Sequence, residues 1–511
     1  MTTAASPFPD AALPLPEVST APRLRHPRAT LLAAAGLGLS AEVLFDGPGM
    51  GLSFPLFTAL VLAALLGLGG REGWQRAAGN RWLLVPVGFF STMVFVRANE
   101  SLTALNVLAT GLLLLLVAHF WAAGRVQRLG LGGYPLTALF SAAYTVILPA
   151  AVLRQEVDLT AARQQAPRML PVLRGGLLAL PVLLVFTALL SSADAVFQQA
   201  VDRLLSLNPF TFLASSLPRL LFSGFMGLGA LGWLAHALRR RRPGELGVAE
   251  AAPGEPRLGF TESLMLVGTV DALFLCFATI QLAFLFGGWH LPHEGLTYAD
   301  YARRGFFELL AVSLLTLGLI VALARWTRLE SEAQGNLFRV GCTVMIGLVL
   351  VILTSAIKRM ALYESAYGYT HLRLFTHVFM GVLGGVLLWR ALTLWWRPER
   401  FALGAFLGAL GYLAAMNVLN PDAFIARENL ERAAEGSDVD TLYIQLRLSE
   451  DAAPVVADYL RAHPEASNSH GLKEFLRRHG TTSAPGGWPG FHLARARAAA
   501  ALREAPFAPS P

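Results

Sequence analysis

The chain alternates between long apolar blocks and short polar gaps, and this alternation predicts a bundle of membrane-spanning helices. Most blocks are about 18 to 25 residues long, the length that a helix needs to cross about 30 Å of hydrocarbon. The gaps carry most of the arginine. Eleven blocks are predicted to cross the membrane: 30–46, 52–70, 82–96, 102–122, 175–192, 217–238, 260–287, 305–324, 338–357, 372–395 and 401–419.

A twelfth apolar block, 134–153, has two interpretations. It has Pro135 and Pro149 near its ends and Arg128 and Arg154 beside it, so it could cross the membrane or lie in the interface. Cytoplasmic loops carry an excess of Lys and Arg. With eleven spans and a cytoplasmic N-terminus, this excess falls on one side, whereas a twelfth span divides the basic residues almost equally. The sequence therefore favours eleven spans and an extracytoplasmic C-terminus.

These spans divide the chain into three parts. Residues 1–29 are polar and rich in Pro and Ala, which predicts a disordered N-terminal tail, and the first apolar block is interpreted as an uncleaved span rather than a signal peptide. Residues 30–420 form the predicted transmembrane domain. Residues 421–511 contain short amphipathic runs, which predict an extramembrane α-helical region. The expected fold class is an all-α polytopic helix bundle.

Composition supports the membrane assignment and excludes nucleic acid as a partner. Of the 511 residues, 54% are hydrophobic and 15% are charged, against about 45–50% and about 25% in ordinary soluble domains. The net charge is +7, but the basic residues lie between apolar blocks instead of on one soluble face. Lys358 and Lys473 are the only lysines. The preference for arginine is typical of a GC-rich bacterium, so we expect the bacterial cytoplasmic membrane.

Few motifs in the chain suggest chemistry. The glycine spacing in 227–232 matches a dinucleotide fingerprint, but it lies inside an apolar block, where glycines let helices approach closely. Gly381 with Gly385 and Gly404 with Gly408 repeat the four-residue spacing and are predicted to pack helices.

The sequence predicts no cofactor and no metal. The segment 290–294, His-Leu-Pro-His-Glu, is interpreted as a solvated loop because its proline prevents a helical face and no fourth ligand follows. Cys276 and Cys342 lie in apolar blocks and are predicted to be packing residues.

Asp271 is the one carboxylate predicted near the bilayer midplane. It lies about 16 Å into the span 260–287 at 1.5 Å per residue. A carboxylate at that depth costs roughly 2.5–3.5 kcal/mol on insertion scales. Two interpretations stay open, a hydrogen bond to a neighbouring helix and a proton-carrying role.

Three polar segments, 297–308, 358–373 and 417–429, are predicted to emerge on the same outer side. Cations there break the positive-inside preference and need carboxylate partners or an anionic ligand. The alternative is a charge-paired outer rim, anchored by interfacial tyrosines, with no ligand. The residues predicted to form a binding mouth are Asp300, Arg303, Arg304, Glu308, Lys358, Arg359, Tyr363, Glu364, Tyr367, Arg373, Asn420 and Asp422.

Stretches in the same region resemble a family of bacterial multi-pass membrane proteins that is known only as a domain of unknown function. The matching stretches are LLSSADAVF (189–197), VDALFL (270–275), LFGG (285–288), LTYADYARRGFFEL (296–309), SAIKRMALYESAYGYTHLRLF (355–375) and LNPDAFIARENLER (419–432). The resemblance implies a fold and a membrane location. It implies no activity and no catalytic residue.

Three functional hypotheses follow from these observations. The first is an inner-membrane protein without classical enzyme chemistry that binds a small polar or anionic ligand, a lipid headgroup or a protein partner at its outer mouth. The second is a proton-coupled transporter that uses Asp271, although the two halves of the chain show no internal similarity. The third is a membrane-embedded transferase or hydrolase with Asp300, Glu308 or Glu364 as base.

Overall fold

The computed structural model describes residues 24–47, 49–156, 186, 209–239, 257–286, 306–436, 440–465, 469–480 and 487–505. Within these residues the regular elements are helices. One isolated β-bridge pairs Leu258 with Thr327. Ten of the helices are long and apolar enough to cross a membrane. The predicted all-α polytopic bundle is therefore confirmed, and the chain is a multi-pass membrane protein.

The first half of the bundle packs around one apolar core. Its helices are α1 (Pro27–Phe45), α2 (Ser53–Arg76), α3 (Leu84–Val96), α4 (Glu100–Ala122), α5 (Gly133–Glu156) and α8 (Pro209–Leu238). Helices α1 and α8 approach closely because both carry glycine at the crossing. A Cβ atom on Gly38 would lie 2.4 Å from the Ser223 carbonyl oxygen, so only glycine fits there.

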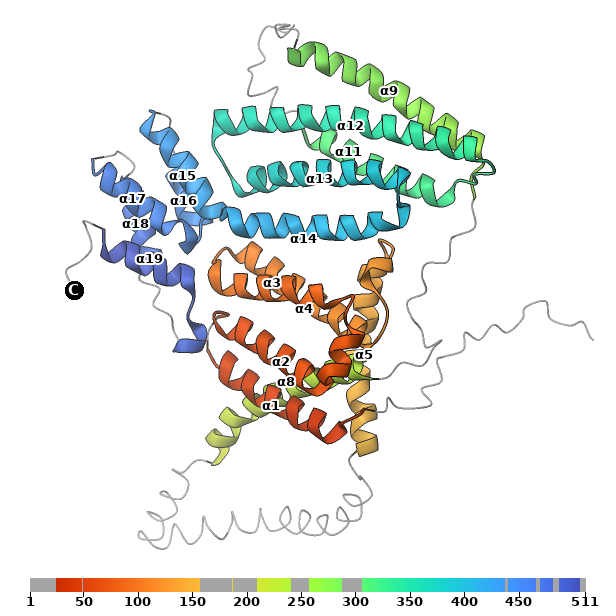
Figure 1. The fold of residues 1–511 in the computed structure, drawn as a ribbon. Helices are drawn as coiled ribbons and strands as arrows, with labels where there is room; N and C mark the ends of the chain where they lie inside the picture. Colours follow the sequence, from red (N-terminus) through yellow and green to blue (C-terminus); the bar gives the residue numbers. More distant parts are fainter. Residues whose placement is uncertain are drawn as a thin grey trace, which may run out of the picture.

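The second half has its own apolar core and lies beside the first (Figure 1). Its helices are α9 (Phe260–Phe286), α11 (Phe306–Trp326), α12 (Glu332–Tyr367), α13 (His371–Trp395) and α14 (Phe401–Leu419). Helix α14 joins the halves, because it packs against α13 while its own residues Ala402, Leu413 and Met416 belong to the first core.

Apart from α5, the long helices run roughly along one axis, so the bundle has two ends (Figure 1). We call the end at which α14 meets α15 the tail end and the other the far end. The ion pair between Arg25 and Glu72 joins the start of α1 to the last turns of α2 at the far end. The ion pair between Asp46 and Arg219 joins the end of α1 to α8 at the tail end. Successive helices alternate between the two ends.

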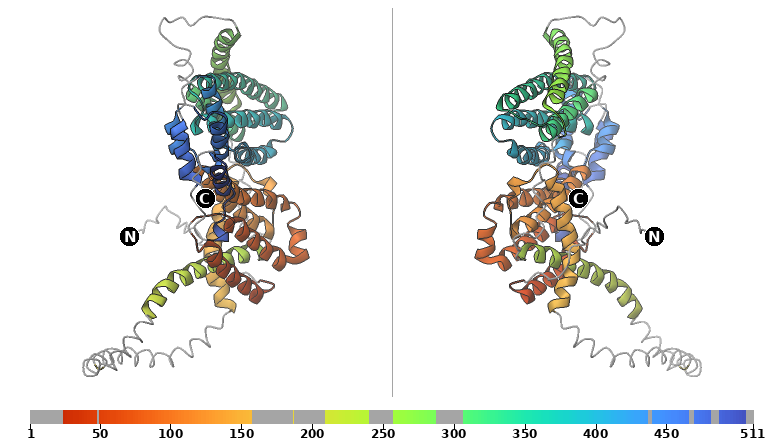
Figure 2. Two further views of the ribbon diagram at one scale, coloured as in Figure 1. Left: turned by 90° about the vertical axis from the view of Figure 1, so that its left-hand side faces the viewer. Right: turned by 90° about the vertical axis from the view of Figure 1, so that its right-hand side faces the viewer.

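Helix α5 departs from this alternation. It covers the ambiguous block 134–153 and has the length to cross a membrane. Figures 1 and 2 show it running across the far end of the bundle, transverse to α1–α4. Helix α4 ends at the far end and α8 starts at the tail end, so the chain has to change ends between them. Helix α5 is nevertheless one of the ten helices with the length and composition of a span, so the number of spans stays a prediction. Apart from Phe186, the predicted span 175–192 lies outside the described residues.

Helix α12 is longer than predicted. The expected span was 338–357, with a polar outer segment after it, but the helix continues to Tyr367 and has 36 residues. At 1.5 Å per residue it is about 54 Å long, against about 30 Å of hydrocarbon. Lys358 to Tyr367 are therefore the last turns of a helix that projects beyond the apolar layer at the tail end.

In the described part of the chain after the bundle, five α-helices dock on the tail end (Figure 1). They are α15 (Pro421–Ala434), α16 (Thr441–Arg447), α17 (Ala453–Ala462), α18 (Ser469–Gly480) and α19 (Leu493–Arg503). Their apolar faces meet one another around Leu460, Leu472 and Phe475. The Leu52 N–H at the start of α2 donates to the Phe491 carbonyl at 2.9 Å, which ties α19 to the bundle.

Candidate functional site

The structure brings the described parts of the three predicted outer segments together at the tail end. The ring centroid of Phe306, at the start of α11, lies 6.4 Å from that of Tyr363 on α12. Asn429 on α15 accepts a hydrogen bond from the Tyr369 N–H at 2.8 Å and donates to the Tyr369 carbonyl at 2.9 Å. The predicted convergence of residues far apart in sequence is therefore present in the fold.

Most of the first segment lies outside the described residues. Asp300, Arg303 and Arg304 are among the residues that are not described, as is the histidine-containing loop 290–294. Glu308 is exposed on the first turn of α11. Its predicted pairing with Arg304 stays a prediction.

Asp422 is the centre of a buried polar cluster between bundle and tail. Its side chain is fully buried near the start of α15. Oδ1 accepts a hydrogen bond from Asn99 Nδ2 at 3.0 Å and contacts His371 Nε2, and Oδ2 accepts from the N–H of Ser449 at 2.9 Å and from its hydroxyl. Burying a carboxylate is costly unless hydrogen bonds replace its hydration. These donors come from α4, α13 and the turn before α17.

His371 is oriented by two partners on opposite sides of its ring. Tyr443 OH lies 3.2 Å from Nδ1, while the backbone N–H of His371 donates to the same hydroxyl oxygen at 2.8 Å. A tautomer protonated at Nε2 satisfies both sides, because Nε2 then donates to Asp422 and Nδ1 accepts from Tyr443. Burial raises the pKa of Tyr443, so the phenol stays a donor.

Asparagine residues extend the polar cluster into the bundle. Asn106 on α4 and Asn417 on α14 exchange two side-chain hydrogen bonds of 2.8 Å, and both are fully buried. Asn420 has φ 55° and joins α14 to α15 in the left-handed conformation that asparagine tolerates. Its Oδ1 is buried and has no hydrogen-bond partner among the described residues.

Asp451 connects the tail to the turn between α3 and α4. Its Oδ2 accepts from the Ala98 N–H at 2.7 Å, and its Oδ1 lies 3.6 Å from Arg97. Burial raises the pKa of Asp451 to about 6, although the Ala98 N–H and the Arg97 charge both act to lower it. The Arg97 Nε also donates to the Asn417 carbonyl at 2.8 Å, so this arginine bridges α14 and the tail.

Two of the predicted mouth residues, Glu364 and Asp422, are buried and contact histidines. The fully buried Glu364 pairs with His377 on α13, with Oε2 and Nδ1 2.7 Å apart. Its other oxygen, Oε1, is buried and meets no hydrogen-bond partner in the described part of the chain. Both acids are held by histidines because the adjoining α13 presents His371 and His377 to the interior of the junction.

Arg373 is a cation held at the tail end without a carboxylate. Its NH1 donates to the carbonyls of Tyr367 and Gly368 at 3.1 and 2.5 Å, which are the last acceptors of α12. The guanidinium carbon lies 4.2 Å from the centroid of the Tyr363 ring and 6.0 Å from that of Tyr367. Within the described residues, Arg373 forms no ion pair, so its charge is balanced there only by π-electrons and peptide dipoles.

The two other predicted cations that the structure describes, Lys358 and Arg359, do not join this arrangement. Lys358 is exposed on α12. Arg359 points to α9, where NH2 donates to Gln281 Oε1 at 3.1 Å and Ser355 donates to the same oxygen at 2.8 Å. The mouth residues that lie together are thus Arg373, Tyr363 and Tyr367.

Sequence reasoning missed several members of the buried cluster. Asn99, His371, Ser449 and Asp451 were not among the predicted site residues, and neither was His377. Their common signal is a polar residue at or near a helix end, which also occurs on ordinary caps. Asn99, for example, caps α4 by accepting from the Leu102 N–H.

Asp271 lies inside the second half of the bundle. It is half-buried on α9, and its Oδ1 is buried with no hydrogen-bond partner among the residues described. Helix α9 packs against α12 at this level, where Val267 contacts Gly341. Asp271 and the buried Arg390 on α13 both lie within electrostatic reach of Cys342 on α12. Arg390 Nε is likewise buried without such a partner.

Residues 84–459 match the family described as Domain of unknown function (DUF4153), which is more than half of the chain. The protein belongs to this family. No curated protein and no solved structure matches the chain. In this DUF4153 protein, the matched region runs from α3 into α17 and contains the whole Asp422 cluster and Arg373. Helices α1, α2, α18 and α19 lie outside it. The family description assigns no activity.

Proposed function

We propose that this protein binds a small polar or anionic ligand at the tail end of α11, α12 and α13, without classical enzyme chemistry. A lipid headgroup or an acidic segment of a protein partner would use the same cation. The proposal places this end on the extracytoplasmic side of a bacterial inner membrane, in agreement with the distribution of arginine along the chain.

The observation that supports this proposal most is the environment of Arg373. A guanidinium has five N–H donors, and the hydrogen bonds of Arg373 to the described residues use only NH1, for two carbonyls. The remaining donors face no carboxylate of the described residues. Tyr363 holds the plane of the guanidinium from one side. The guanidinium of Arg373 is held in place and has unused N–H donors. It can therefore bind a carboxylate or a phosphate through two parallel hydrogen bonds.

Arg373→Gln is expected to abolish the response of the protein to a small carboxylate. Wild-type protein in detergent should unfold at higher temperature as succinate is added, because a ligand that binds only the folded state stabilises it by about 2.7 kcal/mol at 100 times its Kd. The uncharged succinamide should have no effect. The variant should lose the succinate response, as measured by circular dichroism during heating.

Arg432→Gln is the matched control for this experiment. Arg432 also donates to carbonyls near the end of α12, those of Glu364 and Ala366, both at 3.2 Å. Arg432→Gln should lower the unfolding temperature about as much as Arg373→Gln does. It should leave the succinate response intact. A full response in Arg373→Gln, or none in the wild type, would contradict the proposal.

A second candidate function is proton-coupled transport, which the environment of Asp271 favours. A membrane-buried carboxylate with an oxygen that has no hydrogen-bond partner among the described residues is suited to exchange a proton. If Asp271 carries the coupled proton, Asp271→Asn in proteoliposomes should abolish the acidification that accompanies uptake of the substrate, with the fold unchanged. Substrate-linked proton movement equal to that of the wild type would count against this function.

A further inference from the structure

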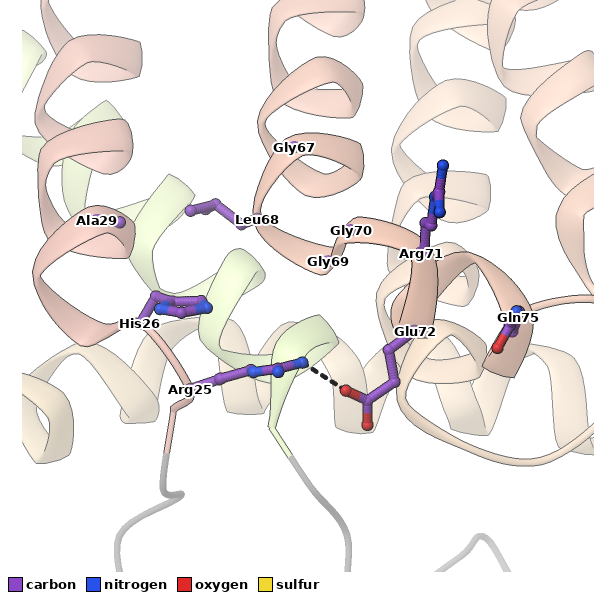
Figure 3. Close-up of a pocket in the computed structure, with 10 residues that line it drawn as sticks. All are labelled: Arg25, His26, Ala29, Gly67, Leu68, Gly69, Gly70, Arg71, Glu72 and Gln75. Carbon is purple, nitrogen blue, oxygen red and sulfur yellow. Dashed lines mark hydrogen bonds and ion pairs between the residues drawn. The ribbon is translucent and has the colours of Figure 1, made fainter.

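A second polar site lies at the far end, where a cavity of about 670 Å³ opens between the start of α1 and the last turns of α2 (Figure 3). Polar groups of Arg25, His26, Arg71, Glu72 and Gln75 line it, together with the backbone of Gly67 to Gly70. It lies at the end of the bundle opposite to Arg373 and outside the matched family region. The two sites are therefore independent.

A break in α2 shapes this cavity. Gly70 has φ 55° and ψ −158°, so the helix stops and restarts in a new direction with Arg71 to Arg76. Trp121 on α4 packs against both sides of the break, since a Cβ on Gly69 or on Gly73 would lie 3.1 or 3.0 Å from its indole nitrogen. The break therefore follows from glycine and from a buried tryptophan. It places Arg71, Glu72 and Gln75 in the lining of the cavity, with Glu72 pointing toward Arg25 and Arg71 pointing the other way (Figure 3).

Positive charge dominates the cavity. Glu72 is the one carboxylate among the described residues that line it, and it pairs with Arg25 at 2.5 Å. Both side chains are largely exposed, at 65% for Arg25 and 44% for Glu72, so this pair contributes little stability and can open for a ligand. Arg71 forms no hydrogen bond or ion pair with the described residues and projects from the break away from the Arg25–Glu72 pair (Figure 3). Arg76 lines an adjoining small cavity that also contains Arg25 and His26.

The opposite wall of the cavity is apolar. Ala29 on α1 and Leu68 on α2 line it, and Leu32, one turn further along α1, is 75% exposed. Because α1 and α2 are membrane-spanning helices, this wall continues into the lipid-facing surface, while the cations lie at the level of the headgroups. Cations at that level attract anionic lipid, and basic pockets between helix ends bind lipid headgroups.

We propose that this cavity binds a phosphate group, held by Arg71 and Arg25 with Gln75 as an additional donor. Phosphate fits because it accepts several hydrogen bonds and pairs with arginine in bidentate geometry. Two sources supply such a group, an anionic phospholipid and a soluble phosphate ester. Glu72 opposes binding by competing for Arg25.

Calorimetric titration of the delipidated full-length protein in detergent tests this site. The probes are a short-chain phosphatidylglycerol, the matching phosphatidylcholine and glycerol 3-phosphate. Arg71→Ala should bind the phosphate probe about tenfold more weakly, which is the loss expected for one charge-assisted hydrogen bond. Tight binding of phosphatidylglycerol alone identifies a lipid site, and equal binding of glycerol 3-phosphate identifies a soluble phosphate ester.

Two further variants distinguish a binding site from a structural ion pair. Arg28→Ala removes an exposed arginine of α1 that does not line the cavity and should leave the affinity unchanged. Glu72→Gln should keep or increase the affinity, because it releases Arg25. If the Arg25–Glu72 pair has only a structural role, Glu72→Gln should instead weaken binding, as Arg71→Ala does. The proposal is overturned if no probe binds, if Arg71→Ala equals Arg28→Ala, or if Glu72→Gln weakens binding.

Discussion

Replacing Asp422 with alanine is expected to lower the free energy of unfolding by about 3–5 kcal/mol. The substitution removes the acceptor of Asn99, of His371 and of two groups of Ser449, and it leaves these donors buried. Because the donors come from both bundle and tail, the loss should loosen the docked tail. Thermal unfolding of the detergent-solubilised protein, combined with limited proteolysis of the tail, measures both effects.

Asp458→Ala is the control for this prediction. Asp458 lies in the same tail, but it is exposed and its ion pair is with Arg461 on its own helix. Its loss should change stability by less than about 1 kcal/mol, the usual range for exposed pairs. If the two variants unfold alike and the tail is equally resistant to protease, the Asp422 cluster does not hold the junction together.

Gly232→Ala is expected to destabilise the protein by about 1–3 kcal/mol or more, the usual cost of overpacking. The new Cβ would lie 1.8 Å from the Thr145 carbonyl oxygen and 3.0 Å from Pro149 of α5. Backbone cannot move aside as a flexible side chain can, so α5 and α8 have to separate. That separation would strain the hydrogen bond of 3.0 Å between Ser141 and His236. The unfolding midpoint in detergent measures the effect.

Gly229→Ala on the same helix tests whether the effect is local. A Cβ there meets nothing within 4 Å among the described residues, and alanine favours helix over glycine by about 1 kcal/mol. This variant should therefore be as stable as the wild type or slightly more stable. Equal destabilisation by both substitutions would show that the close approach of α5 to α8 is not the cause.

Glycine spacing in the sequence predicted helix packing, with partial success. Gly227 lies against Ala34 of α1, and Gly404 and Gly408 lie under the side chains of Trp389 and Val386, as expected. A Cβ atom on Gly381 or Gly385 would meet nothing within 4 Å in the described part of the chain, so for this pair helix packing stays a prediction. The four-residue spacing places two glycines on one helix face, but it does not determine whether a neighbour covers that face.

The sequence by itself determined the fold class and the positions of most spans. Bilayer thickness imposes a length and an apolar composition on each segment separately, so the signal is local and readable. The predicted span 52–70 even ends where α2 breaks at Gly70. The extent of α12 was missed because hydropathy marks the lipid-facing part of a helix, while hydrogen bonds continue through its polar last turns.

Only the tertiary structure decided how the polar residues are used. Asn99 and Asp422 are 323 residues apart and meet because α4, α13 and α15 share one end of the bundle. Arg71 lines a cavity because α2 breaks at Gly70, where Trp121 packs against it. A polar residue at a helix end has the same local pattern whether it caps a helix, binds a neighbour or faces a ligand. Its role depends on which distant donors and acceptors the packed helices place within about 3 Å of it.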